Sequence, residues 1–212
     1  MEKGWNRGGN ESVKEFNVIV AGVGGQGILF TTNVIARAAL KLGLNFAQSE
    51  VHGLSQRYGS IRTELRIGED VSSPLILEGT LDLLIALEPL EGLRQAPYIS
   101  ERTTVIMNDH IIPPIGAYLD RFPIPSFDEV LELMKSLSPR EIITIDAYKI
   151  AKEAGDYITA NTVMLGAAQA SGILPFPEGV LRETLEEVSP PKYRDLNLRA
   201  FDLGREAVVL PR

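Results

Sequence analysis

The chain has 212 residues, 44% of them hydrophobic, which is long enough to bury a substantial core. Its net charge is −7 and no long basic run interrupts it, so a phosphate polymer or an anionic membrane is not an expected partner. The chain has no cysteine, which excludes disulfides, a thiolate nucleophile and cysteine-ligated zinc or iron–sulfur sites in this polypeptide.

The start of the chain is polar, contains glycine and lacks the apolar core of a signal peptide. We expect residues 1–15 to form a flexible arm ahead of a single α/β domain with C-terminal helices at 16–212. No apolar stretch approaches the roughly 20 residues that cross a bilayer, so we expect a cytoplasmic protein. Because His52 and His110 are the only imidazoles and lie far apart in the sequence, no metal site is expected.

A run of apolar and β-branched residues at 16–21 predicts a buried parallel strand. A glycine-rich segment follows, and apolar residues then recur at helical spacing over residues 28–42. The next expected strand covers residues 45–49 and leads into a polar loop over residues 50–60.

Residues 61–67 alternate between apolar and polar, which is typical of a half-exposed strand, and we expect it to be antiparallel and near a sheet edge. Further apolar runs predict two central strands and a last one, at residues 81–87, 103–107 and 142–145.

Ser126 and Glu129 form a capping-box pattern at the start of one helix. Residues 161–171 predict a helix of small residues that can press closely against the sheet or a partner. Other helices are predicted at residues 148–154, 178–188 and 193–209. This alternation favours a three-layer open α/β sheet, mostly parallel with one antiparallel strand and a Rossmann-like first unit. Such sheets bind ligands at the carboxyl ends of their strands.

The glycine-rich segment satisfies the spacing G-x-G-x-x-G through Gly22, Gly24 and Gly27. Glycines let the backbone approach an anion, and the following helix N-terminus offers free N–H groups. The alternative is that these glycines only permit a tight turn and close packing. Gln26 argues against ordinary NAD binding, as does the lack of a clear acid ending a second strand, because Glu50 opens a polar loop.

The loop at residues 50–60 concentrates a histidine, hydroxyls, an amide and an arginine between glycines. Arg57 could bind a carboxylate or phosphate with two hydrogen bonds, and Ser55 and Gln56 lie beside it. The loop lacks the nucleophile-elbow pattern, so no catalytic triad is predicted. The alternative is an ordinary hydrogen-bonded surface loop.

Three motifs together resemble the gamma-type domain of 2-oxoacid:ferredoxin oxidoreductases, and especially the small (beta) subunit of the indolepyruvate branch. They are GVGGQG at residues 22–27, EVHGLSQRYGS at 50–60 and NTVMLG at 161–166. They occur in the family's order, and the resemblance runs from about Phe16 to the C-terminal helices. Tyr58 is a departure, because the family commonly has glycine after the arginine.

The resemblance implies oxidative decarboxylation of an aryl 2-oxoacid such as indolepyruvate with coenzyme A, giving an aryl-acetyl-coenzyme A and reduced ferredoxin. It implies that thiamine diphosphate and [4Fe–4S] clusters belong to a large, cysteine-rich alpha subunit, so that this chain is inactive alone and no catalytic residue is assigned to it. Coenzyme A and the oxoacid would bind at the subunit junction. The residues implied there are Gly22, Gly24, Gly25, Gln26, Gly27, Ser55, Gln56, Arg57 and Asn161.

Asn161 could instead cap its helix. Two other functions also stay open: a stand-alone Rossmann-type NAD-dependent oxidoreductase, and a non-catalytic scaffold or regulatory module.

Overall fold

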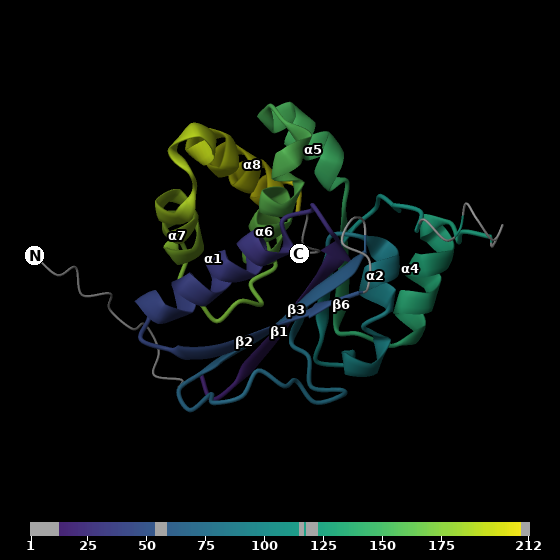
Figure 1. Cartoon of the computed structure of the whole chain (residues 1–212), viewed down its shortest axis with the longest axis horizontal. Helices are drawn as coiled ribbons and strands as arrows, with labels where there is room; N and C mark the ends of the chain where they lie inside the picture. Colours follow the sequence, from purple (N-terminus) through teal and green to yellow (C-terminus); the bar gives the residue numbers. More distant parts are fainter. Residues whose placement is uncertain (1–12, 54–58, 115–116, 118–122, 209–212) are drawn as a thin grey trace, which may run out of the picture.

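A computed structural model describes residues 13–53, 59–114, 117 and 123–208 of the chain. Its centre is a six-stranded sheet in the order β2-β3-β1-β4-β5-β6 (Figure 1). The strands are β1 (Phe16–Val23), β2 (Asn45–His52), β3 (Ser60–Gly68), β4 (Leu83–Ala86), β5 (Thr104–Asn108) and β6 (Glu141–Ile145).

Only β3 runs against the other five strands of this sheet, because it pairs antiparallel with both β1 and β2 while β1, β4, β5 and β6 pair in parallel. The predicted α/β class, with a mostly parallel sheet and one antiparallel strand near an edge, is confirmed. The first unit has the predicted order of strand, glycine loop and helix. Its second strand, β2, then lies at the sheet edge with β3 between it and β1.

The predicted polar loop at residues 50–60 is wrong at both of its ends. Glu50, Val51 and His52 belong to β2, and Ser60 begins β3. Their side chains are polar or exposed, which suggested a loop. The antiparallel ladder nevertheless continues through them, because strand pairing uses the backbone N–H and C=O groups and not the side chains.

The sheet has helices on both faces (Figure 1). One face carries α1 (Ile28–Lys41), α5 (Ala147–Ala154), α6 (Ala160–Ala170), α7 (Val180–Val188) and α8 (Arg194–Glu206). The other carries α2 (Pro89–Leu93) and α4 (Phe127–Ser136). Short 3-10 turns are η1 (Ala96–Tyr98), η2 (Tyr157–Thr159) and η3 (Pro191–Tyr193). The predicted capping box of Ser126 and Glu129 is present at α4.

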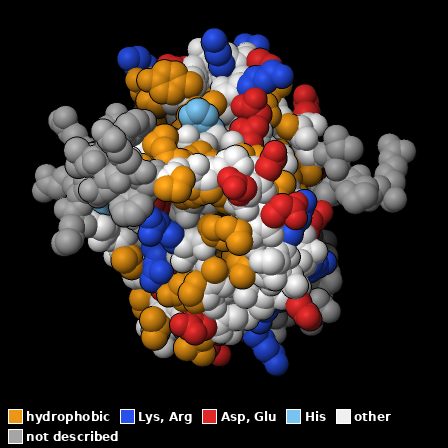
Figure 2. Space-filling model, turned by 90° about the vertical axis from the view of Figure 1, so that its right-hand side faces the viewer, with side chains coloured by type: hydrophobic (Ala, Val, Ile, Leu, Met, Phe, Trp, Pro, Cys, Tyr) orange, Lys and Arg blue, Asp and Glu red, His pale blue; other side chains and the backbone are white. Residues whose placement is uncertain are grey.

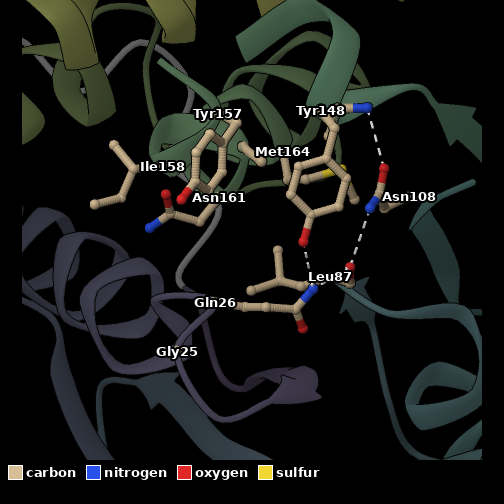
Figure 3. Close-up of a pocket in the computed structure, with 11 residues that line it drawn as sticks. Gly25, Gln26, Leu87, Asn108, Tyr148, Tyr157, Ile158, Asn161 and Met164 are labelled. Carbon is tan, nitrogen blue, oxygen red and sulfur yellow. Dashed lines mark hydrogen bonds between the residues drawn. The ribbon is translucent and has the colours of Figure 1, made fainter. Parts of the chain in front are cut away.

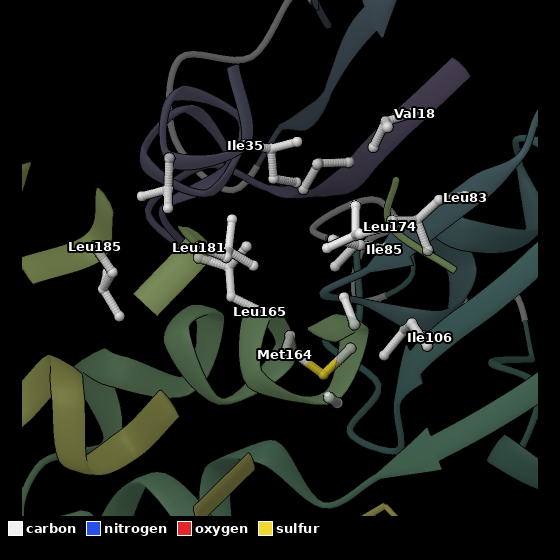
Figure 4. Packing of buried hydrophobic residues seen from close by; sticks show 14 of the residues in the cluster. Val18, Ile35, Leu83, Ile85, Ile106, Met164, Leu165, Leu174, Leu181 and Leu185 are labelled. Atoms are coloured by element: carbon white, nitrogen blue, oxygen red, sulfur yellow. The ribbon is translucent and has the colours of Figure 1, made fainter. Parts of the chain in front are cut away.

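Buried hydrophobic residues form two clusters, one on each face of the sheet. In the larger cluster, Val18, Leu83 and Ile85 of the strands meet Ile35 of α1 and Leu165 of α6 (Figure 4). β1 is buried along its whole length, as expected for a parallel strand that is covered on both sides. None of the helices in the described part of the chain combines the length and hydrophobicity needed to cross a bilayer.

The small residues of α6 allow it to touch α8 backbone to backbone. A Cβ placed on Gly166 would overlap the carbonyl of Phe201, and one placed on Gly204 would overlap the carbonyl of Val163. The close approach that was predicted for this helix is therefore made to another helix of the same chain. This contact fixes α6, which carries Asn161 toward the carboxyl ends of the strands.

The chain changes faces between β1 and β4. After β1 it continues into α1 on one face, whereas after β4 and β5 it continues into α2 and α4 on the other face. A crevice at the carboxyl ends of β1 and β4 is the expected result, and it is where ligands of open α/β sheets bind.

Candidate functional site

The glycine motif overlaps the end of β1 at Gly22 and Val23, and the loop that follows is shaped by two residues with positive φ. Gly25 has φ 99° and Gly27 has φ 78°, a range that side chains other than glycine rarely adopt. Gly22 has a different reason to be glycine, because a Cβ there would lie 2.5 Å from Oε1 of Gln26. The first turn of α1 has no side-chain cap and no acidic residue, so its N–H groups are not neutralised by a carboxylate of that turn.

Gln26 connects the ends of three segments. Its Oε1 accepts a hydrogen bond from the N–H of Val23 (2.8 Å), and its Nε2 donates to the carbonyl of Leu87 (3.0 Å) and to the hydroxyl of Tyr148 (3.0 Å). Asn108 extends this network, since it donates to the same Leu87 carbonyl (3.2 Å) and accepts from the N–H of Ala147 (3.1 Å). The residue that argued against NAD binding is thus a cross-link between the end of β1, the residue after β4 and the first turn of α5.

This network forms the floor of a pocket of about 80 Å³ at the carboxyl edge of the sheet (Figure 3). None of the residues lining it is charged. They are Gly25, Gln26, Leu87, Asn108, Ala147, Tyr148, Tyr157, Ile158, Ala160, Asn161 and Met164.

Asn161 meets the glycine loop across 134 positions of sequence. Its side chain is buried, its Nδ2 lies 3.4 Å from the carbonyl of Gly27, and a Cβ on Gly27 would lie 2.5 Å from that Nδ2. The alternative that Asn161 caps its helix is wrong, because the N-cap of α6 is Thr159. Asn161 is instead a wall of the pocket.

The second motif borders the glycine loop through its last residues. The N–H of Gly24 donates to the carbonyl of Gly59 (3.0 Å), and Ser60 pairs with Val23 in the sheet. The two predicted segments therefore adjoin each other. Ser55, Gln56 and Arg57, like Tyr58, lie outside the described residues.

Glu50 is not placed as the ribose-binding acid of an NAD site. It belongs to the edge strand β2, opposite Thr63 of β3, so β3 separates it from β1. His52 is exposed on the same strand, with its Nε2 3.6 Å from Glu50. Neither residue lines the pocket.

Two buried acids behind the pocket were not predicted. Glu88 caps α2 by accepting from the N–H of Glu91 (2.8 Å), and it also accepts from the N–H of Ile112 (3.1 Å). Burial raises the pKa of Glu88 from 4.5 to about 7, while these backbone hydrogen bonds oppose the rise. Ser60 donates to Glu91 (2.5 Å) and so links this pair to β3. The sequence did carry a signal for Glu88, because a glutamate followed by a proline after a strand is typical of the start of a helix.

Acidic and basic side chains are intermixed with hydrophobic ones on the face seen in Figure 2. Within the described ranges, no group of three His, Asp or Glu side chains could hold a metal ion. The fold and the site define a mixed α/β binding module, with an uncharged, amide-floored pocket at the switch point of its sheet.

Residues 17–207 match the family described as pyruvate ferredoxin/flavodoxin oxidoreductase, and the chain belongs to that family. The chain is 37% identical to indolepyruvate oxidoreductase subunit IorB of Thermococcus kodakarensis, over 92% of this chain and 96% of that one. It is 39% identical to the subunit of the same name from Archaeoglobus fulgidus, with the same coverage. The family resemblance inferred from the three motifs is confirmed.

Solved structures share the fold. The gamma subunit of a keto/oxoacid ferredoxin oxidoreductase from Geobacter sulfurreducens superposes with a TM-score of 0.63 at 22% identity, over 90% of this chain and 96% of that one. A 2-oxoglutarate:ferredoxin oxidoreductase from Magnetococcus marinus gives 0.65 at 23% identity, and there the match covers 92% of this chain but 32% of the longer one.

Proposed function

We propose that the chain is the small subunit of an indolepyruvate:ferredoxin oxidoreductase. The complex would convert an aryl 2-oxoacid and coenzyme A into an aryl-acetyl-coenzyme A and carbon dioxide, with the electrons passing to ferredoxin. The observation that carries this proposal is the similarity to IorB subunits at 37–40% identity, which extends over 95–96% of their own length.

The role of this chain would be to form one wall of the site at the subunit junction. The first turn of α1, directly after the glycine loop, has no side-chain cap and no acidic side chain, so its backbone N–H groups would face an anion there. Arg57, in the segment that follows β2, would add a guanidinium suited to a phosphate of coenzyme A or to the oxoacid carboxylate.

The cofactors of the reaction would belong to the partner subunit. A chain without cysteine cannot ligate [4Fe–4S] clusters by thiolate, and no acidic or histidine cluster in the described part suits the metal of thiamine diphosphate. When bound, thiamine diphosphate supplies the carbanion that cleaves the carbon–carbon bond. This chain's own contribution is binding and positioning.

A large partner is also supported by a relative in which the matching region is one part of a longer chain. The match spans 36% of ketoisovalerate oxidoreductase subunit VorA of Methanothermobacter thermautotrophicus, so the same module is there part of a longer chain. Here Tyr157 and Ile158, on the rim of the pocket, are 69% and 57% exposed, and these side chains would be covered by the partner.

The proposal is tested by co-producing the chain with its cysteine-rich partner and separating the product by size exclusion with an ultraviolet–visible spectrum. We expect one heteromeric peak that carries the broad visible absorption of iron–sulfur clusters. A chain that elutes alone, binds NAD(H) and reduces a carbonyl would favour the stand-alone dehydrogenase. A chain that joins the complex but is dispensable for turnover would favour a scaffold.

The role of Arg57 is tested by Arg57→Ala in the active complex. We expect a higher KM for coenzyme A or for the oxoacid, because binding to an anion is lost. Arg140→Ala is the matched control, since Arg140 is exposed immediately before β6 and does not line the pocket. Unchanged constants for both substrates in Arg57→Ala would contradict this role.

A further inference from the structure

The hydrogen bonds around Gln26 determine which way its amide faces. The N–H of Val23 can only donate, so the atom that meets it must be the oxygen, Oε1. Nε2 then faces the carbonyl of Leu87, which can only accept, and the hydroxyl of Tyr148. The two hydrogens of Nε2 are used by these two partners, and Tyr148 is therefore an acceptor in this contact.

The hydroxyl hydrogen of Tyr148 is consequently not used in this hydrogen bond. Among the residues that the structure describes, the hydroxyl donates to no acceptor, and its one hydrogen bond is the one that it accepts from Gln26. The carbonyl of Leu87 already accepts from both Gln26 and Asn108, which occupies its two lone pairs. The Tyr148 hydroxyl lies at the pocket that this side chain lines (Figure 3).

The phenol ring is also held in place from the other side. The ring of His110 meets it edge-on, with the centroids 5.1 Å apart and the planes at 77°. The ring is held by this contact and the oxygen by Gln26, so the position of the hydroxyl oxygen is set before any ligand arrives.

We infer that Tyr148 donates a hydrogen bond to an anionic oxygen of the bound substrate, either the 2-oxoacid carboxylate or a phosphate of coenzyme A. An anionic acceptor is favoured because the pocket lining contains no carboxylate and because hydrogen bonds to ionised oxygens are the stronger kind. This inference rests on the proposed function and adds a substrate-positioning residue to it.

The dimensions of the pocket limit what enters. About 80 Å³ has room for a charged end group and a few attached atoms, and not for a whole coenzyme. The remainder of either substrate would extend outward past Tyr157 and Ile158 toward the partner subunit.

The test is Tyr148→Phe in the reconstituted two-subunit complex, with indolepyruvate and coenzyme A varied separately. Loss of a hydrogen bond to a charged group predicts a KM that is about tenfold higher for one of the two substrates, with kcat changed less than about twofold. The substrate whose KM rises identifies the source of the anion. Tyr193→Phe is the matched control, because it removes a hydroxyl from a tyrosine of η3 that does not line the pocket.

Direct binding of coenzyme A and of indolepyruvate to the complex, measured by calorimetry, keeps the test valid if the variant turns over poorly. Unchanged affinities and KM values for both substrates in Tyr148→Phe, with an active wild-type complex, overturn this inference alone. An equal effect in Tyr193→Phe also overturns it. A wild-type complex that does not oxidise indolepyruvate overturns the proposed function instead.

Discussion

Replacing Gln26 with leucine removes all three hydrogen bonds of the cross-link and keeps a side chain of similar size. The largest cost comes from the N–H of Val23, a residue that is 6% exposed, because its partner is lost and water has little access. The carbonyl of Leu87 keeps its bond from Asn108, and the hydroxyl of Tyr148 can turn to water in the pocket. One unsatisfied buried donor costs about 1–3 kcal/mol, so we expect the free energy of unfolding to fall by about 2 kcal/mol.

The assay is denaturant unfolding of the purified chain, with the m-value as a check that the unfolded state is unchanged. Gln48→Leu makes the same chemical change at a half-buried position of the edge strand β2 and serves as the control. In addition, Tyr148→Phe should cost less in the Gln26→Leu background than in the wild type, because the shared hydrogen bond is already gone. A loss below about 0.5 kcal/mol in Gln26→Leu, or strict additivity of the two changes, would refute the proposed cross-link.

Three further stability changes and one assembly change follow from the structure. Gly166→Ala should lower the free energy of unfolding by about 1–3 kcal/mol or more, because the new methyl group meets the backbone of Phe201; an unchanged denaturation midpoint would be inconsistent with the helix contact. Ser126→Ala should cost about 1 kcal/mol in the same assay through loss of the capping box, and a neutral result would mean that the cap is not formed. Burial raises the pKa of Glu88 in the folded chain to about 7, so protonated Glu88 stabilises the fold fully below pH 4.5 and this stabilisation is lost as the pH rises to about 7. The free energy of unfolding should therefore fall by up to about 3 kcal/mol across this window in the wild type but not in Glu88→Gln. An unchanged slope in Glu88→Gln would exclude Glu88 as the source of the pH dependence. Ile158→Ser should leave the stability of the chain nearly unchanged but weaken its association with the large subunit by about tenfold, as measured by calorimetric titration; equal affinity would place the interface elsewhere.

Most of the fold could be predicted because its signals are local. The strand at β1 is a continuous apolar run, and the capping box starts α4. The alternation of residues 61–67 marks the strand β3, but the prediction that β3 is half-exposed is wrong, because Glu64 on its polar face is buried as well. The position of β2 could not be predicted in the same way. Its place at the edge depends on pairing with β3. The hydrophobic pattern of one strand does not identify the strand that pairs with it.

The candidate site shows the same division. The glycine spacing indicated a tight loop at the end of β1, and the positive φ values of Gly25 and Gly27 confirm it. Tyr148 and Asn108 carried no such signal, because one enters the pocket from α5 and the other from the end of β5, and both are tied to the site through Gln26 and the carbonyl of Leu87. Glu88 was missed since its buried environment comes from packing, although its position before a proline was visible.

The most direct test of the account is the turnover of indolepyruvate with coenzyme A and oxidised ferredoxin by the large subunit alone, by this chain alone and by the two together. If this chain is the small subunit, only the combination forms the acyl-coenzyme A product and reduces ferredoxin, and the activity saturates as this chain is added. Full turnover by the large subunit without this chain, or turnover by this chain on its own, would contradict it.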